Sequence, residues 1–570
     1  MMNTGTAQVP LYAAVEGRAR RLSEEEVAFF DPAVDRTHVM TAQVLGALET
    51  CRAFQPMEAH VAAVIAAQAE LRGQDQAVRR VLEGFAARGL LITDDAFLAR
   101  LRRQPQAAQA EYAGHCLLGE HSPQALQETR AALDTATVPQ VFVIDEALRQ
   151  RVLADLIAAV PDQAEAVRAL IAPRGGSVSA DRNLASLLAA GARYTCSEAA
   201  QSLAFRRHPG HLPGLGFEPA PWQAQTHASV EALMSAGAPL DVDAALAMSL
   251  SACGRTLGDA LADAGSGVDF GPAGLRGRAP SHAPALRGET RFAVIALGQR
   301  GVFAADANPW LYLLDPRARG EWLTDAQRYA DLKDAVPTWR GSAWMQVGSG
   351  GQARPFAFDA SRMLPGLPQV GTSRAGEDAL FMSLCQVLDP AAQMLEWPVS
   401  LARRAPVAAG SSASTAEPEA IGMADFLADL AAGVAGELLS QDTAVRWQVL
   451  LARMADLQAA DERTLLGHLR EFFVHRHASA LQRLQAVYAG SPDAPDGWRD
   501  ALRDLIQAHA AMVIERAVPR FASWPAGLGS ADCIERFRRE LAMQAAQLRV
   551  WPALWEIALA NRRRWAGAAG

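Results

Sequence analysis

Between residues 138 and 200 the hydrophobic pattern alternates between two periods, and this alternation restricts the possible folds more than any other feature. A β-branched run, VPQVFVIDE, is followed by the helical pattern ALRQRVLADLIAAV. A second apolar run, AVRALIA, precedes the helical segment ADRNLASLLAAGA, and ARYTCSEAA completes the series. Strand, helix, strand, helix, strand at this spacing predicts a doubly wound parallel sheet, in which ligands bind at the carboxyl ends of the strands.

The regions on either side of this alternation follow other patterns, so the 570-residue chain divides into several parts. Residues 10–104 contain three helical patterns with strand-like ends, and residues 105–137 are predicted to be a connector with some helix. An α/β core is predicted over 138–406, followed by a low-complexity linker. Every segment from 421 to 565 has the amphipathic pattern of a helix, which predicts an all-α C-terminal domain.

Charge and cysteine content argue against several classes of protein. Lys and Arg number 54 against 62 for Asp and Glu, so the net charge of −8 argues against nucleic acid as a partner. The six cysteines are scattered without a CxxC pair, which predicts neither a disulfide framework nor a zinc ribbon. The sequence has no apolar leader and no run of about 18 apolar residues. We therefore expect a cytoplasmic protein that does not bind membranes.

Residues 10–104 carry a recognisable pattern. A strand-like start near Tyr12 precedes a helix that opens at Thr41, and the last helix leads into ARGLLI at 87–92. This arrangement resembles the winged-helix PqqD-like recognition element of enzymes that modify ribosomally synthesised peptide natural products (RiPPs). The resemblance implies that a precursor peptide docks here through its leader, as a strand added to a sheet edge. A purely structural or a DNA-binding winged helix is the alternative.

Three segments of the core resemble glycosyltransferases of the GT-A type, family 2-like. In SADRNLASLLAAGA, at 179–192, an Arg-Asn pair opens a helix that leads to the next strand. ARYTCSEAA stands where such enzymes carry aspartates at the end of a strand, and TSRAGEDALF, at 372–381, resembles the segment over the acceptor site. The resemblance covers 138–406 and implies an enzyme that uses a nucleotide sugar as its substrate. A bacterial source is indicated by the cations, nearly all of which are arginine.

The expected metal motif departs from the family pattern. A nucleotide diphosphate leaving group needs its charge neutralised, and Mn²⁺ or Mg²⁺ held by carboxylates serves this purpose. This chain reads Thr195, Cys196, Ser197 and Glu198 at the corresponding position. Glu198 is therefore the one candidate metal ligand of the motif, and a single carboxylate is a poor cage unless phosphates and waters supply most of the other ligands.

Arginines offer a way to do without the metal. In this interpretation Asp378 is the general base for an acceptor hydroxyl or thiol, Glu377 positions it, and guanidinium groups pair with the diphosphate. The alternative is that both acidic residues simply begin a helix, where the macrodipole favours negative charge. The residues assigned to donor binding are Arg182, Asn183, Glu198, Arg374, Arg403 and Arg404.

Other features are assigned structural roles. The Gly/Pro/Ser-rich stretch within 222–290 is predicted to be a long surface segment. Trp551, Trp555 and Trp565, which have three arginines among them, are predicted to pack on the domain below. His208 and His211 have the spacing of a metal pair, but the intervening Pro-Gly predicts a turn.

The sequence thus predicts a glycosyltransferase-like protein that transfers a sugar to a peptide side chain in RiPP biosynthesis. An alternative from another class is a catalytically inactive relative, a pseudoenzyme that binds the leader peptide or acts as a scaffold for other biosynthetic proteins. A regulator that uses the winged helix on DNA is the third hypothesis.

Overall fold

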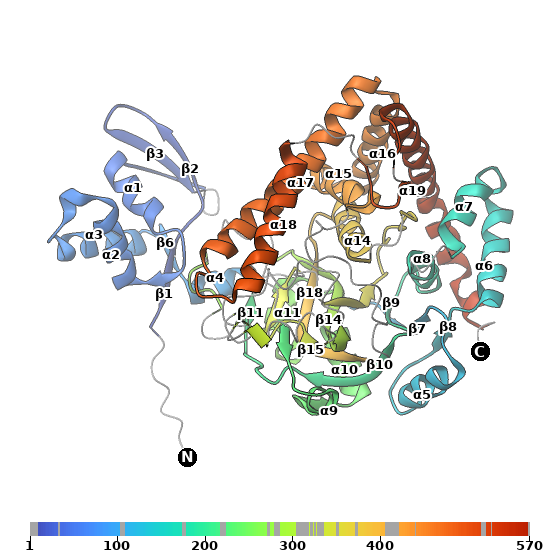
Figure 1. The fold of residues 1–570 in the computed structure, drawn as a ribbon. Coiled ribbons are helices and arrows are strands. Elements are labelled where there is room, and N and C mark those ends of the chain that lie inside the picture. The colour runs from blue at the N-terminus through green and yellow to red at the C-terminus, as the bar shows by residue number, and fades with distance from the viewer. Residues whose placement is uncertain are drawn as a thin grey trace, which may run out of the picture.

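The computed structural model describes most of the chain, and its architecture is mixed α/β with a large mixed sheet and a C-terminal helical region (Figure 1). The residues described are 9–31, 35–102, 109–173, 178–216, 224–270, 274–278, 286–303, 319, 323, 326–327, 336–348, 353–370, 374–404, 421–438, 440–514, 520–525 and 527–567. The apolar run WLYLLD and the linker after residue 404 lie outside these ranges.

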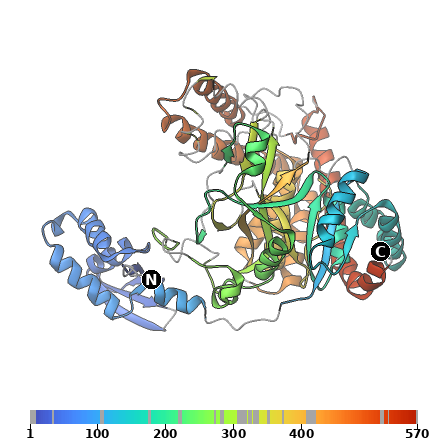
Figure 2. The same ribbon diagram turned by 90° about the horizontal axis from the view of Figure 1, so that it is seen from below.

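The described residues of 9–102 form a lobe at the edge of the molecule (Figures 1 and 2). The three predicted helices are present, but the antiparallel sheet β2-β3-β4 before them was not predicted. Thr41 caps the first of these helices by accepting a hydrogen bond from Val44 N at 3.3 Å. The elements are β1 (Leu11–Ala14), β2 (Arg18–Arg21), β3 (Glu26–Asp31), β4 (Arg36–Thr41), α1 (Ala42–Thr50), β5 (Gln55–Pro56), α2 (Met57–Ala67), α3 (Asp75–Ala87), β6 (Leu91–Thr93) and α4 (Asp94–Leu101).

The described strands of the core form one mixed sheet with a central path in the order β11-β16-β18-β14-β17-β9-β7-β8. Strands β7, β8 and β9 run parallel, as do β14 and β18, whereas β17 is antiparallel to both of its neighbours. The strands are β7 (Tyr112–Leu118), β8 (Val141–Val143), β9 (Arg193–Glu198), β10 (Gln201–Arg207), β11 (Leu215–Gly216), β12 (Ala224–Thr226), β13 (Ala238–Leu240), β14 (Arg291–Phe303), β15 (Val336–Arg340), β16 (Met345–Val347), β17 (Arg354–Asp359) and β18 (Ala392–Arg403).

Two sequence predictions in this region are wrong. The connector 105–137 contains β7, which lies between β8 and β9 in the main sheet. The run AVRALIA is not a strand but helix α7 (Ala164–Ile171), because Val167, Leu170 and Ile171 are buried on one face at helical spacing. Only β8 and β9 of the three predicted strands exist, and β7 takes the place of the third.

One face of the sheet is covered by helices from three parts of the chain. Helix α8 (Ser179–Leu188) is buried along its whole length, and α19 (Ser530–Gly567) crosses beside α6, α7 and α8 (Figures 1 and 2). These helices share one hydrophobic core with the sheet. The other helices of this layer are α6 (Glu146–Ala159), α14 (Arg374–Leu388), α15 (Met423–Glu437), α16 (Thr443–Ala459) and α17 (Glu462–Ala489). The C-terminal region is therefore helical, as predicted, but its core is continuous with that of the sheet.

The predicted packing of the C-terminal tryptophans is confirmed. Trp551 and Trp555 lie within this core, and the indole of Trp551 donates a hydrogen bond to Leu364 O at 2.6 Å. Trp565 is also buried and donates to Asp155 at 2.7 Å. Helix α18 (Asp496–Ile514) packs on α17. Across the described residues no helix combines the length and the apolar character needed to cross a membrane.

The opposite face of the sheet meets the N-terminal lobe. A second hydrophobic core joins residues of the lobe to β14, β17 and β18 and to α10 (Val242–Ala252) and α11 (Leu257–Ala262). Phe54 of the lobe exchanges backbone hydrogen bonds with Gly277 and Arg278. The prediction of a surface segment fails for the described part of the Gly/Pro-rich stretch, since Val268, Phe270 and Leu275 are buried. Helices α5 (Pro123–Asp134) and α9 (Val230–Ser235) complete this part of the fold.

Candidate functional site

The carboxyl ends of β7 and β9 define the candidate site. The chain passes from β7 to β8 on one side and then returns to β9 on the other side, so the strand order reverses at β7. In α/β sheets the crevice at such a reversal is the usual place for a ligand. The last residue of β7 pairs with Glu198, the last residue of β9, so both strands end at the same level.

Asp181 fixes the first turn of α8 against this edge of the sheet. Its carboxylate accepts a hydrogen bond from Gly119 N, just after β7, at 2.6 Å. The other oxygen pairs with Arg149 of α6, also at 2.6 Å. Both side chains are buried, so the pair holds α6, α8 and the end of β7 in one arrangement. Arg182 follows Asp181, and this anchor determines where its guanidinium lies.

Arg182 connects the two residues on which the predicted site depends. Its guanidinium forms an ion pair with Asp378 of α14, and it lies 3.9 Å from the carboxylate of Glu198. Arg354, the first residue of β17, binds the second oxygen of Asp378 at 2.7 Å. We call Arg182, Glu198, Arg354 and Asp378 the carboxyl-edge cluster. The structure thus brings together three of the residues assigned from the sequence.

Asp378 is held in its charged form. Burial raises the pKa of this carboxyl, but the guanidiniums of Arg182 and Arg354 outweigh burial and hold the pKa below its ordinary value. A carboxylate paired in this way is a weak proton acceptor as long as both arginines stay bound to it.

More arginines lie close to the cluster at the same edge. The guanidiniums of Arg340 and Arg403 lie over the ring of Phe303, at the end of β14, at 3.8 and 5.0 Å from its centroid. Burial, together with the nearby charges of Arg403 and Arg354, lowers the pKa of Arg340 to about 9. Arginines from β15, β17 and β18 therefore gather beside the carboxyl-edge cluster, which makes this edge suited to an anionic ligand.

Arg404 occupies a different position from the one predicted. Its guanidinium donates to Gln201 O at 2.8 Å and to Thr129 Oγ1 at 2.7 Å, and it pairs with Glu128. These contacts brace α5 against the start of β10. The sequence assigned Arg404 to the diphosphate, whereas the structure uses its guanidinium to hold two elements together.

Asn183 also has a structural environment. Its amide nitrogen donates to Leu170 O and Leu367 O at 3.0 and 2.9 Å, and its oxygen accepts from Leu367 N at 2.7 Å. These bonds tie α7 and the segment after β17 to α8 and use both atoms of the amide inside the fold. Glu377 is 1% exposed in the first turn of α14. The side chain of Arg374, at the start of the same helix, lies outside the described residues.

The donor atoms at the end of β9 do not fit a hard divalent cation. Thr195 and Ser197 each form a hydrogen bond of 2.8 Å with the buried ring of His115, on the face of the sheet away from α8. Burial raises the pKa of the Cys196 thiol to about 12, so it stays protonated. Among the described residues no group of three or more His, Cys, Asp or Glu is arranged to hold a metal ion. Glu198 is left as the single carboxylate of the motif, beside a cation.

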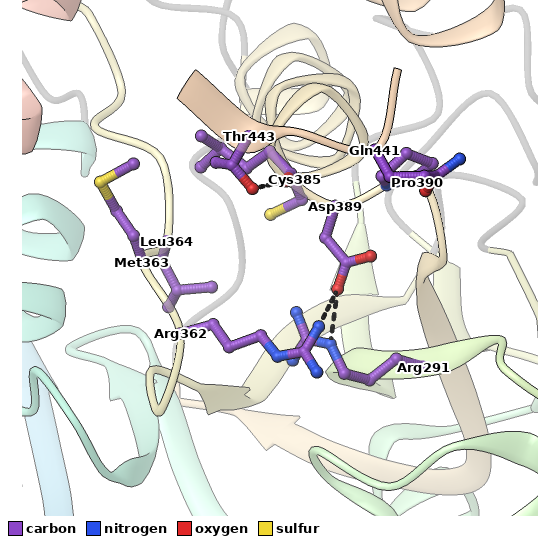
Figure 3. Close-up of a pocket in the computed structure, with 10 residues that line it drawn as sticks. Arg291, Arg362, Met363, Leu364, Cys385, Asp389, Pro390, Gln441 and Thr443 are labelled. Atoms are coloured by element: carbon purple, nitrogen blue, oxygen red, sulfur yellow. Dashed lines mark hydrogen bonds and ion pairs between the residues drawn. The ribbon is translucent and has the colours of Figure 1, made fainter. Parts of the chain in front are cut away.

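A second ionic cluster lines a pocket of about 230 Å³ at the other edge of the sheet (Figure 3). Asp389 accepts hydrogen bonds from Arg291 and Arg362, each at 2.9 Å, and Arg291 also pairs with Asp359. We call these four residues the amino-edge cluster, because Arg291 begins β14 and Asp389 precedes β18. Each charge in it already has an opposite partner, so the cluster holds the sheet and α14 together.

The sequence reasoning missed Arg354, Arg340 and His121. Both arginines stand at the ends of short strands, where a charged residue ordinarily faces solvent. His121 follows β7, and its Nδ1 lies 3.0 Å from Gly119 O. Burial lowers the pKa of His121, which favours the neutral ring. His121 lies just beyond the carboxyl end of β7, so a correct prediction of that strand would have pointed to this residue.

Comparison with known proteins gave no match to this chain among protein-family models, curated proteins or solved structures.

Proposed function

We propose that this chain is a GT-A-like glycosyltransferase of RiPP biosynthesis, which transfers a sugar from a nucleotide-sugar donor to a peptide side chain in the bacterial cytoplasm. The single observation that carries the proposal is the carboxyl-edge cluster. Arg182, Glu198 and Asp378 come from segments about 180 residues apart in sequence and meet at the reversal point of the sheet.

Arginines take the part of the metal in this proposal. Arg182, Arg354 and Arg403 are the residues that would hold the diphosphate, since guanidinium groups bind phosphate oxygens in pairs. They stabilise the negative charge that develops on the leaving diphosphate as the glycosidic bond to the sugar breaks. In this proposal the arginines of the chain supply the positive charge that a metal ion would otherwise provide for sugar transfer.

Donor binding also controls the base. When phosphate oxygens draw Arg182 and Arg354 away from Asp378, the carboxylate loses the two charges that depress its pKa. Asp378 then becomes a stronger acceptor for the proton of the peptide hydroxyl or thiol. This order makes the base weak in the free protein and effective only with donor bound.

The N-terminal lobe supplies the peptide in this proposal. We assign it as a PqqD-like winged-helix recognition element that binds the leader of the precursor peptide on residues 10–104. Its sheet β2-β3-β4 has edge strands on both sides, and a cavity of about 290 Å³ lies between Phe29 of this sheet and Leu48 of α1. A sheet edge of this kind accepts an extended peptide as an additional strand.

A second function is supported by a specific observation. The end of β9 has Thr195, Cys196 and Ser197 where the resembling enzymes have aspartates, and the two hydroxyls and the thiol are used inside the fold. A pseudoenzyme that keeps the fold but only binds the peptide, as a scaffold for other biosynthetic proteins, accounts for this loss. Binding of a nucleotide-sugar donor distinguishes the transferase from the scaffold.

Calorimetry of the full chain with common nucleotide sugars, with and without Mn²⁺, is the test. The proposal predicts binding of at least one donor with an affinity that Mn²⁺ does not change, and weaker binding by Arg354→Gln. Heat from no donor would favour the scaffold. In a transfer assay with the active donor, Asp378→Asn is expected to bind the donor but lose transfer, and equal rates would remove the base assignment.

A further inference from the structure

A larger cavity, of about 610 Å³, lies on the face of the sheet opposite α8 and α14. Its floor is formed by β18 and the end of β10, and α10 forms one wall. None of the residues that line this cavity belongs to the carboxyl-edge cluster, whose Asp378 lies on α14, on the other face of the sheet. The cavity is thus separate from the carboxyl-edge cluster, and its volume is typical of small-molecule sites.

The walls of this cavity suit a flat aromatic ring. Trp397 is 5% exposed, and Met248 and Met345 lie at the same cavity, together with Pro213 and Pro398. Indole and proline surfaces stack on aromatic rings, and methionine sulfur makes favourable contacts with ring edges.

Gly267 allows one wall to lie close to the floor. It adopts a left-handed conformation with φ +70°, and a Cβ atom at this position would lie 3.3 Å from the ring of Trp397. A side chain here would be strained and would press on the indole.

The polar groups of the cavity leave one fixed positive charge for a ligand. Ser251 Oγ and Ser266 Oγ already donate to backbone carbonyl groups of α10, of α11 and of Ser266 itself. Asp269 lies 3.9 Å from Arg102 of the N-terminal lobe, which offsets its charge. The guanidinium of Arg207 has no ion pair with any described residue. Burial, together with the charge of Arg207, lowers the pKa of His211, so this ring is neutral.

From the aromatic walls and the charge of Arg207 we infer that this cavity is a second binding site, for a small molecule that combines a flat aromatic ring with a carboxylate. The ring lies in the part of the cavity lined by Trp397, Met248 and Met345, and the carboxylate points to Arg207. The inference is independent of the proposed glycosyl transfer, because it uses none of the residues of the carboxyl-edge cluster.

Indole-3-acetate and its neutral analogue indole-3-acetamide are the probes. Saturation-transfer NMR and calorimetry with the full chain are expected to show binding of both, with the acetate about two- to fivefold tighter, as is typical of an exposed charge pair. Arg207→Gln is expected to remove this difference and leave the binding of the acetamide unchanged.

A pair of matched variants locates the site. Ala247 is an exposed residue of α10 that lines the cavity, so Ala247→Trp fills it without disturbing the core. We expect this variant to bind the acetate about tenfold more weakly or worse. Ala455→Trp, at an exposed position of α16 away from the cavity, is expected to bind like the parent.

Three results would each overturn the inference: no binding of indole-3-acetate by the parent, equal affinity of the parent for acetate and acetamide, or unchanged binding by Ala247→Trp. Nucleotide-sugar binding is measured separately, so a failure of one proposal is distinguishable from a failure of the other.

Discussion

The carboxyl-edge and amino-edge clusters lie at opposite edges of one sheet, and each consists of two arginines and two carboxylates. Helix α14 links them, since Asp378 lies in its first turns and Asp389 directly follows its last residue. Their surroundings differ. Asp359 and Asp389 each accept a backbone N–H in a turn, from Ser361 and Ala391 at 3.1 and 3.0 Å. Asp378 is held by side chains, those of Arg182 and Arg354.

This difference separates a structural cluster from one that can react. The amino-edge carboxylates cannot move without breaking the turns that hold them, so the cluster is rigid. In the carboxyl-edge cluster Asp378 is held by the long side chains of Arg182 and Arg354, which can reach another partner by a change of rotamer. It also lies where α/β sheets bind their ligands. Two clusters with the same types of charged residue therefore have different roles. One stabilises the fold at the amino edge, and the other is suited to binding a ligand at the carboxyl edge.

The largest expected effect tests the structural role of the amino edge. Asp359→Ala leaves the buried Arg291 without one of its two carboxylates, and breaking a buried ion pair costs about 3–5 kcal/mol. We expect the free energy of unfolding to fall by this amount in urea titrations followed by tryptophan fluorescence. A change below 1 kcal/mol would show that the amino-edge cluster does not hold the sheet together.

A buried carboxyl outside both clusters gives the next largest effect. Glu396 of β18 accepts a hydrogen bond from Ser342 N at 2.7 Å, and burial raises its pKa from 4.5 to about 7. Between these values the folded protein keeps a proton that the unfolded chain loses, so the stabilisation present below pH 4.5 is lost as the pH rises through 7.

Glu396→Gln removes this titration and keeps the oxygen that accepts from Ser342. Because one pKa unit corresponds to 1.36 kcal/mol, we expect the variant to be more stable than the parent at pH 8 by up to about 3 kcal/mol and equal to it at pH 4. Denaturant titrations at both pH values measure this. If the variant and the parent differed in stability by the same amount at pH 4 and at pH 8, the pKa of Glu396 would not be raised. This carboxyl would then not differ in its titration from the carboxylates that are paired with arginine.

The third prediction concerns ligand binding at the carboxyl edge. Arg182 remains paired with Asp378 when Arg354 is lost, so Arg354→Gln is expected to lower the free energy of unfolding by only about 1 kcal/mol. In the proposed donor complex the substitution removes charge-assisted hydrogen bonds to the diphosphate that contribute about 1.5–3 kcal/mol. The donor affinity measured by calorimetry is therefore expected to fall about tenfold or more. A large loss of stability with unchanged affinity would make this cluster structural, like its counterpart.

Elements of the fold could be predicted where the residues of the element alone indicate its structure. Strand β14 was predicted from RFAVIALGQRGVF, whose continuous apolar run at 292–297 is short and ends at a glycine. Strand β7 was missed because YAGHCLL contains a glycine and a histidine. That histidine, His115, is tolerated in the core only because Thr195 and Ser197, 80 residues later, supply its hydrogen bonds. No local pattern reveals such a partner.

Some residues of the candidate site could likewise be predicted from the sequence, and others could not. Arg182, Glu198 and Asp378 were grouped through the resemblance to a family, and the structure brings them together. Arg354 carries no motif, and only the pairing of β17 with β9 and β14 places it beside Asp378. Arg404 was assigned to the diphosphate from its neighbourhood in sequence, but the register of β10 against β18 directs it to α5.

The smallest expected effect decides whether the comparison itself holds. Arg362 lines the amino-edge pocket and is 64% exposed, so its ion pair with Asp389 is screened by solvent. Arg362→Gln is expected to change neither the affinity for nucleotide sugars nor, beyond about 0.5 kcal/mol, the stability. It is the matched control for Arg354→Gln, because each variant removes one partly exposed arginine from a four-residue cluster. Were Arg362→Gln to weaken donor binding while Arg354→Gln did not, the ligand would lie in the amino-edge pocket, and the roles of the two edges would be reversed.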